Sequence, residues 1–258
     1  FGDEPDPAQI AQFMEAVFGY SDGLIPVRSF IDKGQGFDGR PHNIWIEADA
    51  AAPDKMVTFA GWAAREGAAV YVIPGTVAEP GQARAADIEQ MQTVVVDLDT
   101  GDIAAARAHL ARHLGPPTMV VESGGVTPEG QRKAHVWWKL TEPAEGSDIA
   151  RVTRLRGDIA AKVGGDTHFR SAHQPIRVAG SVYYKNSLKT LVRIVELNAD
   201  FERDLDEFVE AVTDMPPAPG VSLQPEFTHT DRPAVDDVLV TPVREGAVDD
   251  WSRFEGAS

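Results

Sequence analysis

The chain of 258 residues contains no cysteine. Disulfide frameworks, thiolate zinc sites, iron–sulfur clusters and cysteine nucleophiles are therefore excluded, and any metal ion must bind oxygen or imidazole ligands. The sequence also lacks any run of 18 or more apolar residues, and its first residues lack the charged and apolar regions of a secretory signal. We expect a cytoplasmic protein with no membrane partner.

Positive charge is scarce, because 24 Lys and Arg stand against 40 Asp and Glu and give a net charge of -16. Such a balance argues against nucleic acid as a partner, since polyanion binding normally needs a basic surface. The charge is uneven, however: residues 1–122 sum to -10, residues 123–193 to +6 and residues 194–258 to -12. A basic middle section in an acidic chain suits a confined anionic ligand such as a triphosphate or a template strand. Ordinary surface variation is the alternative.

Residues 1–90 have the pattern of an N-terminal α/β module. Asp6 as N-cap, Pro7 and the apolar spacing that follows predict a helix that ends at Gly19. The remaining elements are expected as strands at 25–31 and 43–48, a helix at 53–65 and a strand at 69–73.

Residues 91–198 show the order β-α-β-β-α-β. Strands are expected at 93–98, 118–122, 134–140 and 191–195, and helices after a cap at Thr100 or Asp102 and after a cap at Ser147. An 11-residue loop is expected from Ser123 to Lys133. This order is typical of the ferredoxin-like, or RRM-like, unit. We therefore predict an α+β fold with an RRM-like catalytic module at 91–198, a helix within 199–215, beginning near Phe201, and an acidic, proline-rich linker or tail at 216–258.

The pair Asp97 and Asp99 ends the apolar strand of this module. Alternate residues of a strand share a face, so the two carboxylates lie about 6–7 Å apart along it. Neighbouring carboxylates repel each other unless one is protonated or a cation lies between them, and hard divalent cations prefer oxygen ligands. The pair therefore favours Mg²⁺ or Mn²⁺. The alternative is a strand that ends in solvent and caps the next helix.

The third strand of the module places His135, Trp137 and Lys139 on one face. In a ferredoxin-like sheet the first and third strands are neighbours, so His135 is expected beside the Asp pair, where it can donate to a phosphate or ligate a metal. Ser123 and Gly124 end the second strand at the same edge, and a glycine there lets backbone N–H groups approach an anion.

Three further residues complete the set of candidates. Asp166 follows a helix end, where its charge gains nothing from the helix dipole, and it fits a third metal ligand. Arg177 and Lys185 lie on either side of a glycine turn, and both bind phosphate well, one as a fork and the other as a point charge. Solvated charges in loops and hairpins are the alternative for all three.

Together these residues resemble the archaeo-eukaryotic primase superfamily, specifically the primase-polymerase domains of plasmid and phage replication proteins. The resemblance spans about residues 8–195. The family pattern looks matched by Asp97 and Asp99, then Ser123-Gly124 with His135, then Asp166, then Arg177 with Gly180 and Lys185. Two departures are the long segment between Ser123 and His135 and Ala179 in place of the usual proline.

The resemblance implies a DNA primase or polymerase that catalyses two-metal nucleotidyl transfer. Asp97, Asp99 and Asp166 would hold Mg²⁺ or Mn²⁺, while the incoming nucleoside triphosphate would be held by Ser123, Gly124, His135, Arg177 and Lys185. A single-stranded DNA template and a prokaryotic plasmid or phage setting are implied as well. Because Phe1 stands where Met is usual, we expect a fragment, followed beyond Ser258 by a helicase domain or accompanied by a separate helicase; no Gly-x4-Gly-Lys stretch occurs in this sequence.

Two other classes remain open. A haloacid-dehalogenase-like phosphatase also uses an Asp-x-Asp strand, but it wants Thr or Val where this chain has Gly101, and its motif begins a larger parallel sheet. A metal-independent RRM-like module would stack the bases of single-stranded nucleic acid on exposed aromatics, and Trp137 shares the face of His135. A relaxase is disfavoured because no His-x-His motif accompanies Tyr183-Tyr184.

Overall fold

The structure, a computed structural model, describes residues 4–31, 41–185 and 188–222. Its α-helices are α1 (Pro7–Phe18), α2 (Ala52–Arg65), α3 (Ile103–Leu114), α4 (Ser147–Val163) and α5 (Leu205–Asp214), with short 3-10 helices η1 (Ala85–Asp87) and η2 (Thr167–Arg170). The strands are β1 (Leu24–Ile31), β2 (His42–Glu47), β3 (Ala68–Val72), β4 (Thr76–Val77), β5 (Ile88–Leu98), β6 (Met119–Val126), β7 (Arg132–Glu145), β8 (Ile176–Arg177), β9 (Val182–Lys185), β10 (Leu188–Leu191), β11 (Arg193–Leu197) and β12 (Glu202–Arg203). None of these described helices is long and apolar enough to cross a membrane.

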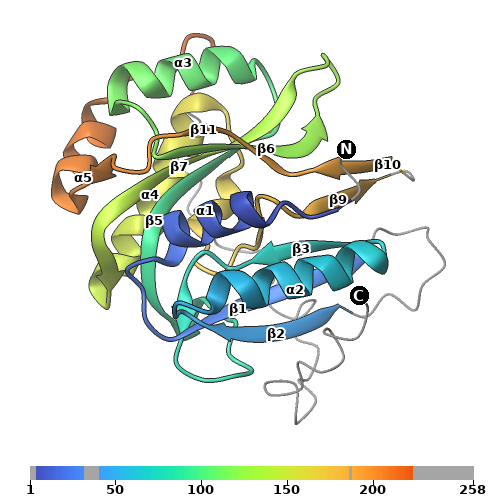
Figure 1. Ribbon diagram of the computed structural model, residues 1–258. Helices are drawn as coiled ribbons and strands as arrows, with labels where there is room; N and C mark the ends of the chain where they lie inside the picture. The colour runs from blue at the N-terminus through green and yellow to red at the C-terminus, as the bar shows by residue number, and fades with distance from the viewer. Residues whose placement is uncertain (1–3, 32–40, 186–187, 223–258) are drawn as a thin grey trace, which may run out of the picture.

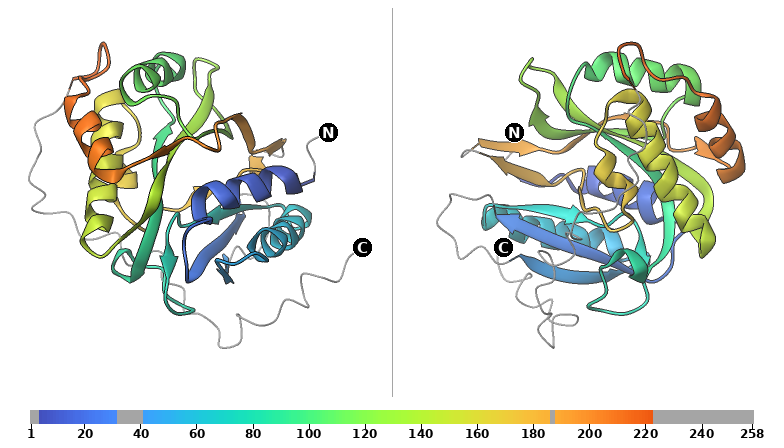
Figure 2. Two further views of the ribbon diagram at one scale, coloured as in Figure 1. Left: turned by 60° about the vertical axis from the view of Figure 1, so that its left-hand side comes forward. Right: turned by 180° about the vertical axis from the view of Figure 1, so that it is seen from behind.

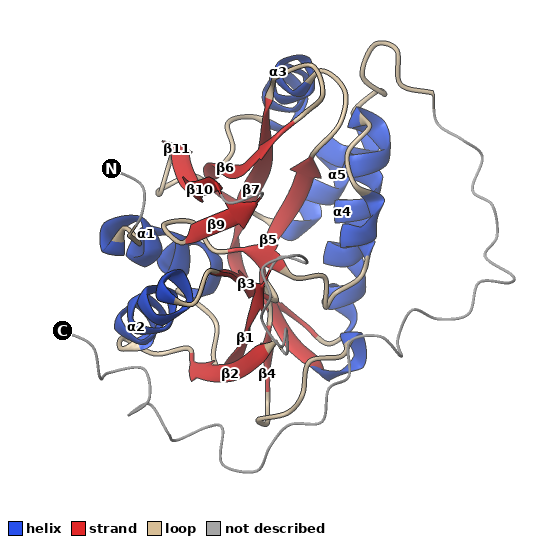
Figure 3. Cartoon of the chain, turned by 90° about the vertical axis from the view of Figure 1, so that its right-hand side faces the viewer, coloured by secondary structure: helices blue, strands red, loops and turns tan. Residues whose placement is uncertain are grey.

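One sheet runs through the molecule in the order β11-β6-β7-β5-β4-β1-β3-β8, with β2 beside β1 and β12 beside β7. Helices α1 and α2 lie on one face of this sheet and α3, α4 and α5 on the other (Figures 1 and 3). Strands β9 and β10 form a separate hairpin. The predicted division into two modules at residue 90 stays a prediction. Strand β5 begins at Ile88, and one continuous sheet runs from it through β4 into the N-terminal strands.

The two faces of β5 bury apolar side chains in two different cores. Val94 and Val96 pack in a cluster with α3, α4 and α5, whereas Val95 packs in a second cluster with α1, α2 and β1 to β3. All three valines are fully buried, as expected of a strand covered on both sides. Packing on both faces therefore fixes the position of β5 as far as Asp97.

Helix α1 connects the two parts of the sheet. Its N-cap Asp6 accepts hydrogen bonds from the backbone N–H groups of Ala8 and Gln9, as the sequence predicts. Phe13 packs edge-on against Trp137 of β7, with ring centroids 5.5 Å apart. Figure 2 shows α1 and α2 together on one side of the molecule from two further directions.

The predicted ferredoxin-like unit is wrong in the position of its fourth strand. The first three strands, β5, β6 and β7, have the expected arrangement, with β7 between the other two. The ferredoxin-like order requires the fourth strand beside the first, but β11 pairs with β6 at the far edge, and β4 takes the place beside β5. The N-terminal strands occupy the edge that β11 would need.

Several predicted boundaries also change. The 11-residue loop does not exist: Ser123 lies inside β6, Lys133 lies inside β7, and the chain between the strands spans 127–131. Asp102, and not Thr100, caps α3, whereas Ser147 is the first residue of α4 and provides no side-chain cap. The last helix begins at Leu205. Most of the predicted tail lies outside the described residues.

Gly180 lies where α1 begins, between Arg177 and β9. Its φ of +82° is in the left-handed region, and a Cβ there would lie 2.6 Å from the carbonyl oxygen of Asp6 and 2.7 Å from the backbone nitrogen of Ile10. Its own carbonyl accepts the N–H of Asp6, and its N–H donates to Val192. Only glycine fits this crossing of three segments.

We predict that Gly180→Ala destabilises the fold by about 3 kcal/mol or more, because a backbone clash adds to the left-handed strain. Gly130→Ala is the matched control: its φ is +87°, but a Cβ there meets nothing within 4 Å, so about 1 kcal/mol is expected. Urea unfolding of both variants measures the difference. Equal losses would show that the close approach at Gly180 does not matter.

Candidate active site

Asp97 and His135 face each other across β5 and β7. They are direct partners in the antiparallel register, as the sequence predicts, and Asp97 Oδ1 lies 3.7 Å from His135 Nε2. The His135 side chain is buried, whereas Asp97 keeps about a fifth of its side-chain surface exposed. The pair thus lies at the floor of the site, with the carboxylate nearer to solvent.

Burial determines the charge state of both groups. Burial, reinforced by the carboxylates of Asp99 and Asp166, raises the pKa of Asp97 to about 7. Burial, with a smaller effect of the positive charge on Arg177, lowers the pKa of His135 to about 3, so this imidazole is neutral near pH 7. Among the described residues, neither Asp97 Oδ1 nor His135 Nδ1 has a hydrogen-bond partner.

Asp166 is tied to Asp97 through the backbone. Its N–H donates to the carbonyl oxygen of Asp97 at 2.9 Å, and its side chain caps η2 and contacts the imidazole of His168. Gly165 permits this approach, because a Cβ there would lie 2.8 Å from the same carbonyl oxygen. The structure therefore brings the third predicted carboxylate beside the Asp pair.

Arg177 points at the site from the other half of the sheet. Strand β8 pairs with β3, and the guanidinium donates to the carbonyl oxygen of Ser123 at 2.9 Å. The centroid of the Tyr183 ring lies 3.8 Å from the guanidinium carbon, which is a stacking distance, and Tyr71 OH accepts from Nε at 3.3 Å. These contacts fix the orientation of the fork.

Ser123 and Gly124 lie in β6, where Tyr183 packs against Gly124: a Cβ on this glycine would lie 3.0 Å from the ring. Ser123 is buried and is linked to Arg177 through its carbonyl group. Lys185 is the last residue of β9, and its side chain lies outside what the structure describes. Its predicted contact with a phosphate stays a prediction.

The carboxylates fit a divalent cation by chemistry more than by their present geometry. In the described part of the chain, no three His, Asp or Glu side chains are close enough together to chelate one ion. Three carboxylates nevertheless interact electrostatically, and Asp97 carries a buried oxygen without a hydrogen bond. A hard cation relieves both costs, so Asp97, Asp99 and Asp166 are suitable ligands after side-chain rotation.

Sequence reasoning missed two groups of this site. Lys133 Nζ lies 3.7 Å from Asp99 Oδ2, and Tyr183 stacks on Arg177. A signal existed for Lys133, because it lies two residues before His135 on the same strand and therefore shares its face. No sequence signal marks Tyr183, since its contact depends on how the β9–β10 hairpin returns to the sheet.

The alternative classes lose support from the same geometry. Trp137 is 1% exposed and packs under α1, so it is not a stacking platform for bases. Strand β5 is antiparallel to both of its neighbours, unlike the first strand of a parallel phosphatase sheet. Tyr184 is buried and donates to the carbonyl oxygen of Ala64, which removes it as a relaxase nucleophile.

Comparison with known proteins defines the class of fold. No protein-family model and no curated protein sequence matches the chain. Solved structures do match, and the chain has the fold of primase and primase-polymerase domains. The resemblance to the archaeo-eukaryotic primase superfamily is thereby confirmed at the level of the fold.

Two solved structures carry this statement. The AEP domain of the cyanophage S-2L primase-polymerase has a TM-score of 0.57 at 17% identity, and the match covers 81% of this chain and 98% of that one. The catalytic domain of primase RepB′, in complex with initiator DNA, has a TM-score of 0.53 at 16% identity, and the match covers 80% and 93%.

We predict that Asp97→Asn stabilises the cation-free protein at pH 8 by about 1–3 kcal/mol, because a buried carboxylate beside two others is replaced by a neutral amide. Millimolar Mn²⁺ should raise the melting temperature of the wild type and leave that of Asp97→Asn nearly unchanged. Asp200→Asn, at an exposed position, is the control and should behave as the wild type. Equal Mn²⁺ shifts in both variants would exclude Asp97 as a ligand.

Proposed function

We propose that this chain is the catalytic domain of a template-directed DNA primase or polymerase that transfers nucleotides from nucleoside triphosphates. The single observation that supports it best is that Asp97, at the end of β5, feels the charges of the Asp99 and Asp166 carboxylates and of the Arg177 guanidinium, which Ser123 holds in place. This arrangement lies on a fold found in primases and primase-polymerases. Fold alone would not carry the proposal, because one fold hosts many functions.

The reaction is the attack of a 3′-hydroxyl on the α-phosphate of a bound triphosphate, with pyrophosphate as the leaving group. Two divalent cations, Mg²⁺ or Mn²⁺, would supply Lewis-acid stabilisation of the attacking and leaving oxygens when bound. Asp97, Asp99 and Asp166 would hold and orient them. No separate general base is required in this scheme.

The other side chains bind the triphosphate. Arg177 presents a fork that is already oriented by Ser123 and Tyr183, so little side-chain entropy is lost when phosphate binds. His135 is neutral and donates one hydrogen bond to a phosphate oxygen; it does not contribute a positive charge. Lys185 is assigned to the triphosphate as well. Gly124 provides a backbone N–H group for the same ligand.

The biological setting follows from the same proposal. The template is single-stranded DNA, and the domain functions in replication of a plasmid or phage in a prokaryotic cytoplasm. A helicase domain or a separate helicase would part the strands ahead of it. The locally basic section 123–193 contributes Ser123, Arg177 and Lys133 to the site, which agrees with an anionic substrate.

We predict that Asp97→Ala and Asp99→Ala each abolish template-directed synthesis, because either change removes a cation ligand. The assay incubates protein, a single-stranded template, labelled triphosphates and Mg²⁺ or Mn²⁺, with and without primer, and resolves products by length. Asp200→Ala is the control and should retain wild-type synthesis. Full metal-dependent synthesis by either site variant would contradict the assignment.

We also predict that Arg177→Lys raises the KM for the triphosphate about tenfold or more, with a smaller change in kcat. Lysine keeps the charge but loses the bidentate fork and the stacking on Tyr183. Arg154→Lys, at an exposed position of α4, is the conservative control. An unchanged KM in Arg177→Lys would remove this residue from the triphosphate site.

A further inference from the structure

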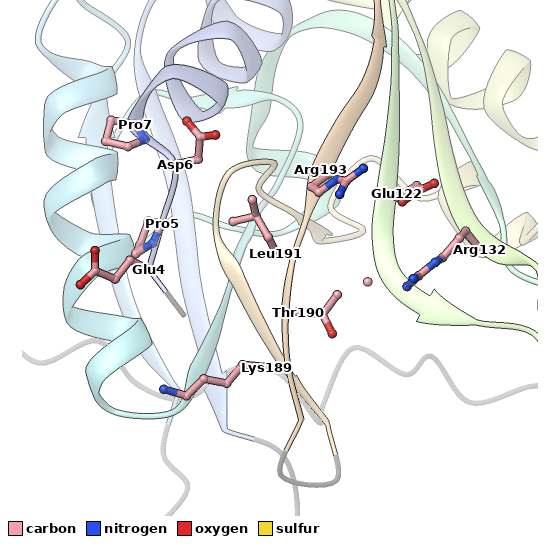
Figure 4. A pocket seen from close by; sticks show the side chains of 11 residues that line it. Glu4, Pro5, Asp6, Pro7, Glu122, Arg132, Lys189, Thr190, Leu191 and Arg193 are labelled. Carbon is pink, nitrogen blue, oxygen red and sulfur yellow. The ribbon is translucent and has the colours of Figure 1, made fainter. Parts of the chain in front are cut away.

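A buried arginine on the far side of β5 takes no part in the proposed chemistry. The groove between the β9–β10 hairpin and the segment that leads into α1 opens beside Gly124 and belongs to the site already described (Figure 4). Arg156 lies elsewhere, in the middle of α4, on the face of the sheet opposite to α1. Its side chain is fully buried, and no carboxylate among the described residues pairs with it.

Two backbone carbonyl groups hold the guanidinium of Arg156. Its Nη2 donates to the carbonyl oxygen of Thr93 in β5 at 2.7 Å and to that of Pro74, before β4, at 3.3 Å. Among the described residues, Nε and Nη1 have no hydrogen-bond partner. Burial lowers the pKa of Arg156 to about 9, so the group is still charged at pH 7. A buried charge without a counter-ion costs stability, and an apolar side chain would fill the same space at lower cost.

The alternation of β5 changes beside this contact. Met91 and Val94 pack in the same core with α3, α4 and α5, although residues three apart on a regular strand lie on opposite faces. The pairing with β7 shifts at the same place, between Met91 and Thr93. Gln92 lies at the shift, and its buried side chain donates to the carbonyl oxygen of Ala16 in α1. One residue is therefore inserted into the alternation of β5.

This register shift determines the face on which Asp97 lies. After the shift, Val94 and Val96 pack toward α4, Val95 packs toward α1, and Asp97 follows Val95 on the side of the site. If the alternation continued unbroken from Met91, Asp97 would turn into the core under α4. Irregularities of this kind are known to redirect side chains next to active sites.

The carbonyl group of Thr93 lacks the usual partner from a neighbouring strand. Strand β4 pairs with β5 only at Ile88 and Gln90, which lie before the shift. On the other side, Lys139 is the register partner of Thr93, but its N–H donates to the hydroxyl of Thr118. The guanidinium of Arg156 thus supplies the donor that a strand would otherwise supply.

We propose that Arg156 is a positioning residue: it holds the carbonyl group of Thr93, fixes the register shift of β5, and so keeps the carboxylate of Asp97 on the face of the site. Arg156 reaches this role from α4, whose end leads through Gly164 and Gly165 to Asp166. What Asp97 does at the site rests on the proposed function. Its position can be measured without catalysis.

The first test is a double-mutant cycle of Arg156→Met with Asp97→Asn, measured by urea unfolding of the cation-free protein at pH 8. Asp97→Asn is expected to stabilise the wild type. In the Arg156→Met background this gain should fall to less than half, because the carboxylate is no longer held beside Asp99 and Asp166. Substitutions at residues that do not contact each other normally have additive effects. An equal gain in both backgrounds would overturn the proposal.

The second test measures Mn²⁺ binding from the paramagnetic resonance signal of the free ion. Arg156→Met should weaken binding about tenfold, whereas Arg156→Lys, which keeps the charge and a donor group, should stay within about threefold of the wild type. Arg154→Met, at an exposed position of the same helix, is the matched control and should bind as the wild type. Unchanged affinity in Arg156→Met would contradict the role of Arg156.

Both tests are made on variants that circular dichroism shows to be folded. If Arg156→Met does not fold, Arg156→Gln takes its place, because its shorter amide reaches at most one of the two carbonyl oxygens. The same losses are then expected at smaller size. Additive unfolding effects together with unchanged Mn²⁺ affinity in Arg156→Gln would likewise overturn the proposal.

Failure of this inference differs from failure of the proposed function. A wild type that synthesises DNA, with additive effects of Arg156→Met and Asp97→Asn, would overturn the role of Arg156 alone. A wild type that makes no product, but in which the two substitutions are coupled, would overturn the proposed function and leave Arg156 as the residue that positions Asp97.

Discussion

In the antiparallel pairing of β5 with β7, Val95 lies opposite Trp137 and Asp97 lies opposite His135. The first pair is buried under α1 and the second forms the floor of the candidate site, so one register serves both the core and the chemistry. A slip of one residue would turn every side chain of a strand to the other face. The burial of Trp137 therefore protects the position of His135, although the tryptophan takes no part in the reaction.

The candidate site depends on contacts between the two halves of the sheet. Arg177 belongs to β8, which pairs with β3, yet its guanidinium donates to Ser123 of β6. Helix α1 spans the same junction, with Phe13 on Trp137 and Gly180 against its first turn. Contacts between segments far apart in the sequence thus bring the cationic and anionic sides of the site together.

The sequence predicts the features whose causes are local. Alternation along β5 predicts Asp97 and Asp99 on one face, and Asp6 with Pro7 predicts the start of α1; the structure confirms that helix start and the pairing of Asp97 with His135. The place of β11 could not be predicted, because the sheet edge that it takes depends on where the N-terminal strands pack. Strands of two to four residues, such as β8 and β9, are too short to show a period.

The bond from the Asp166 amide to the Asp97 carbonyl has a consequence for how such sequences can diverge. This hydrogen bond joins the two ends of the segment between these residues. The segment contains α3, the β6–β7 turn and α4. Insertions in the turn at 127–131 would lengthen an excursion without displacing its ends. Gly165 cannot be replaced in the same way, because a Cβ there would lie 2.8 Å from the Asp97 carbonyl oxygen. The number of residues between Asp97 and Asp166 can therefore vary, whereas Gly165 cannot be replaced.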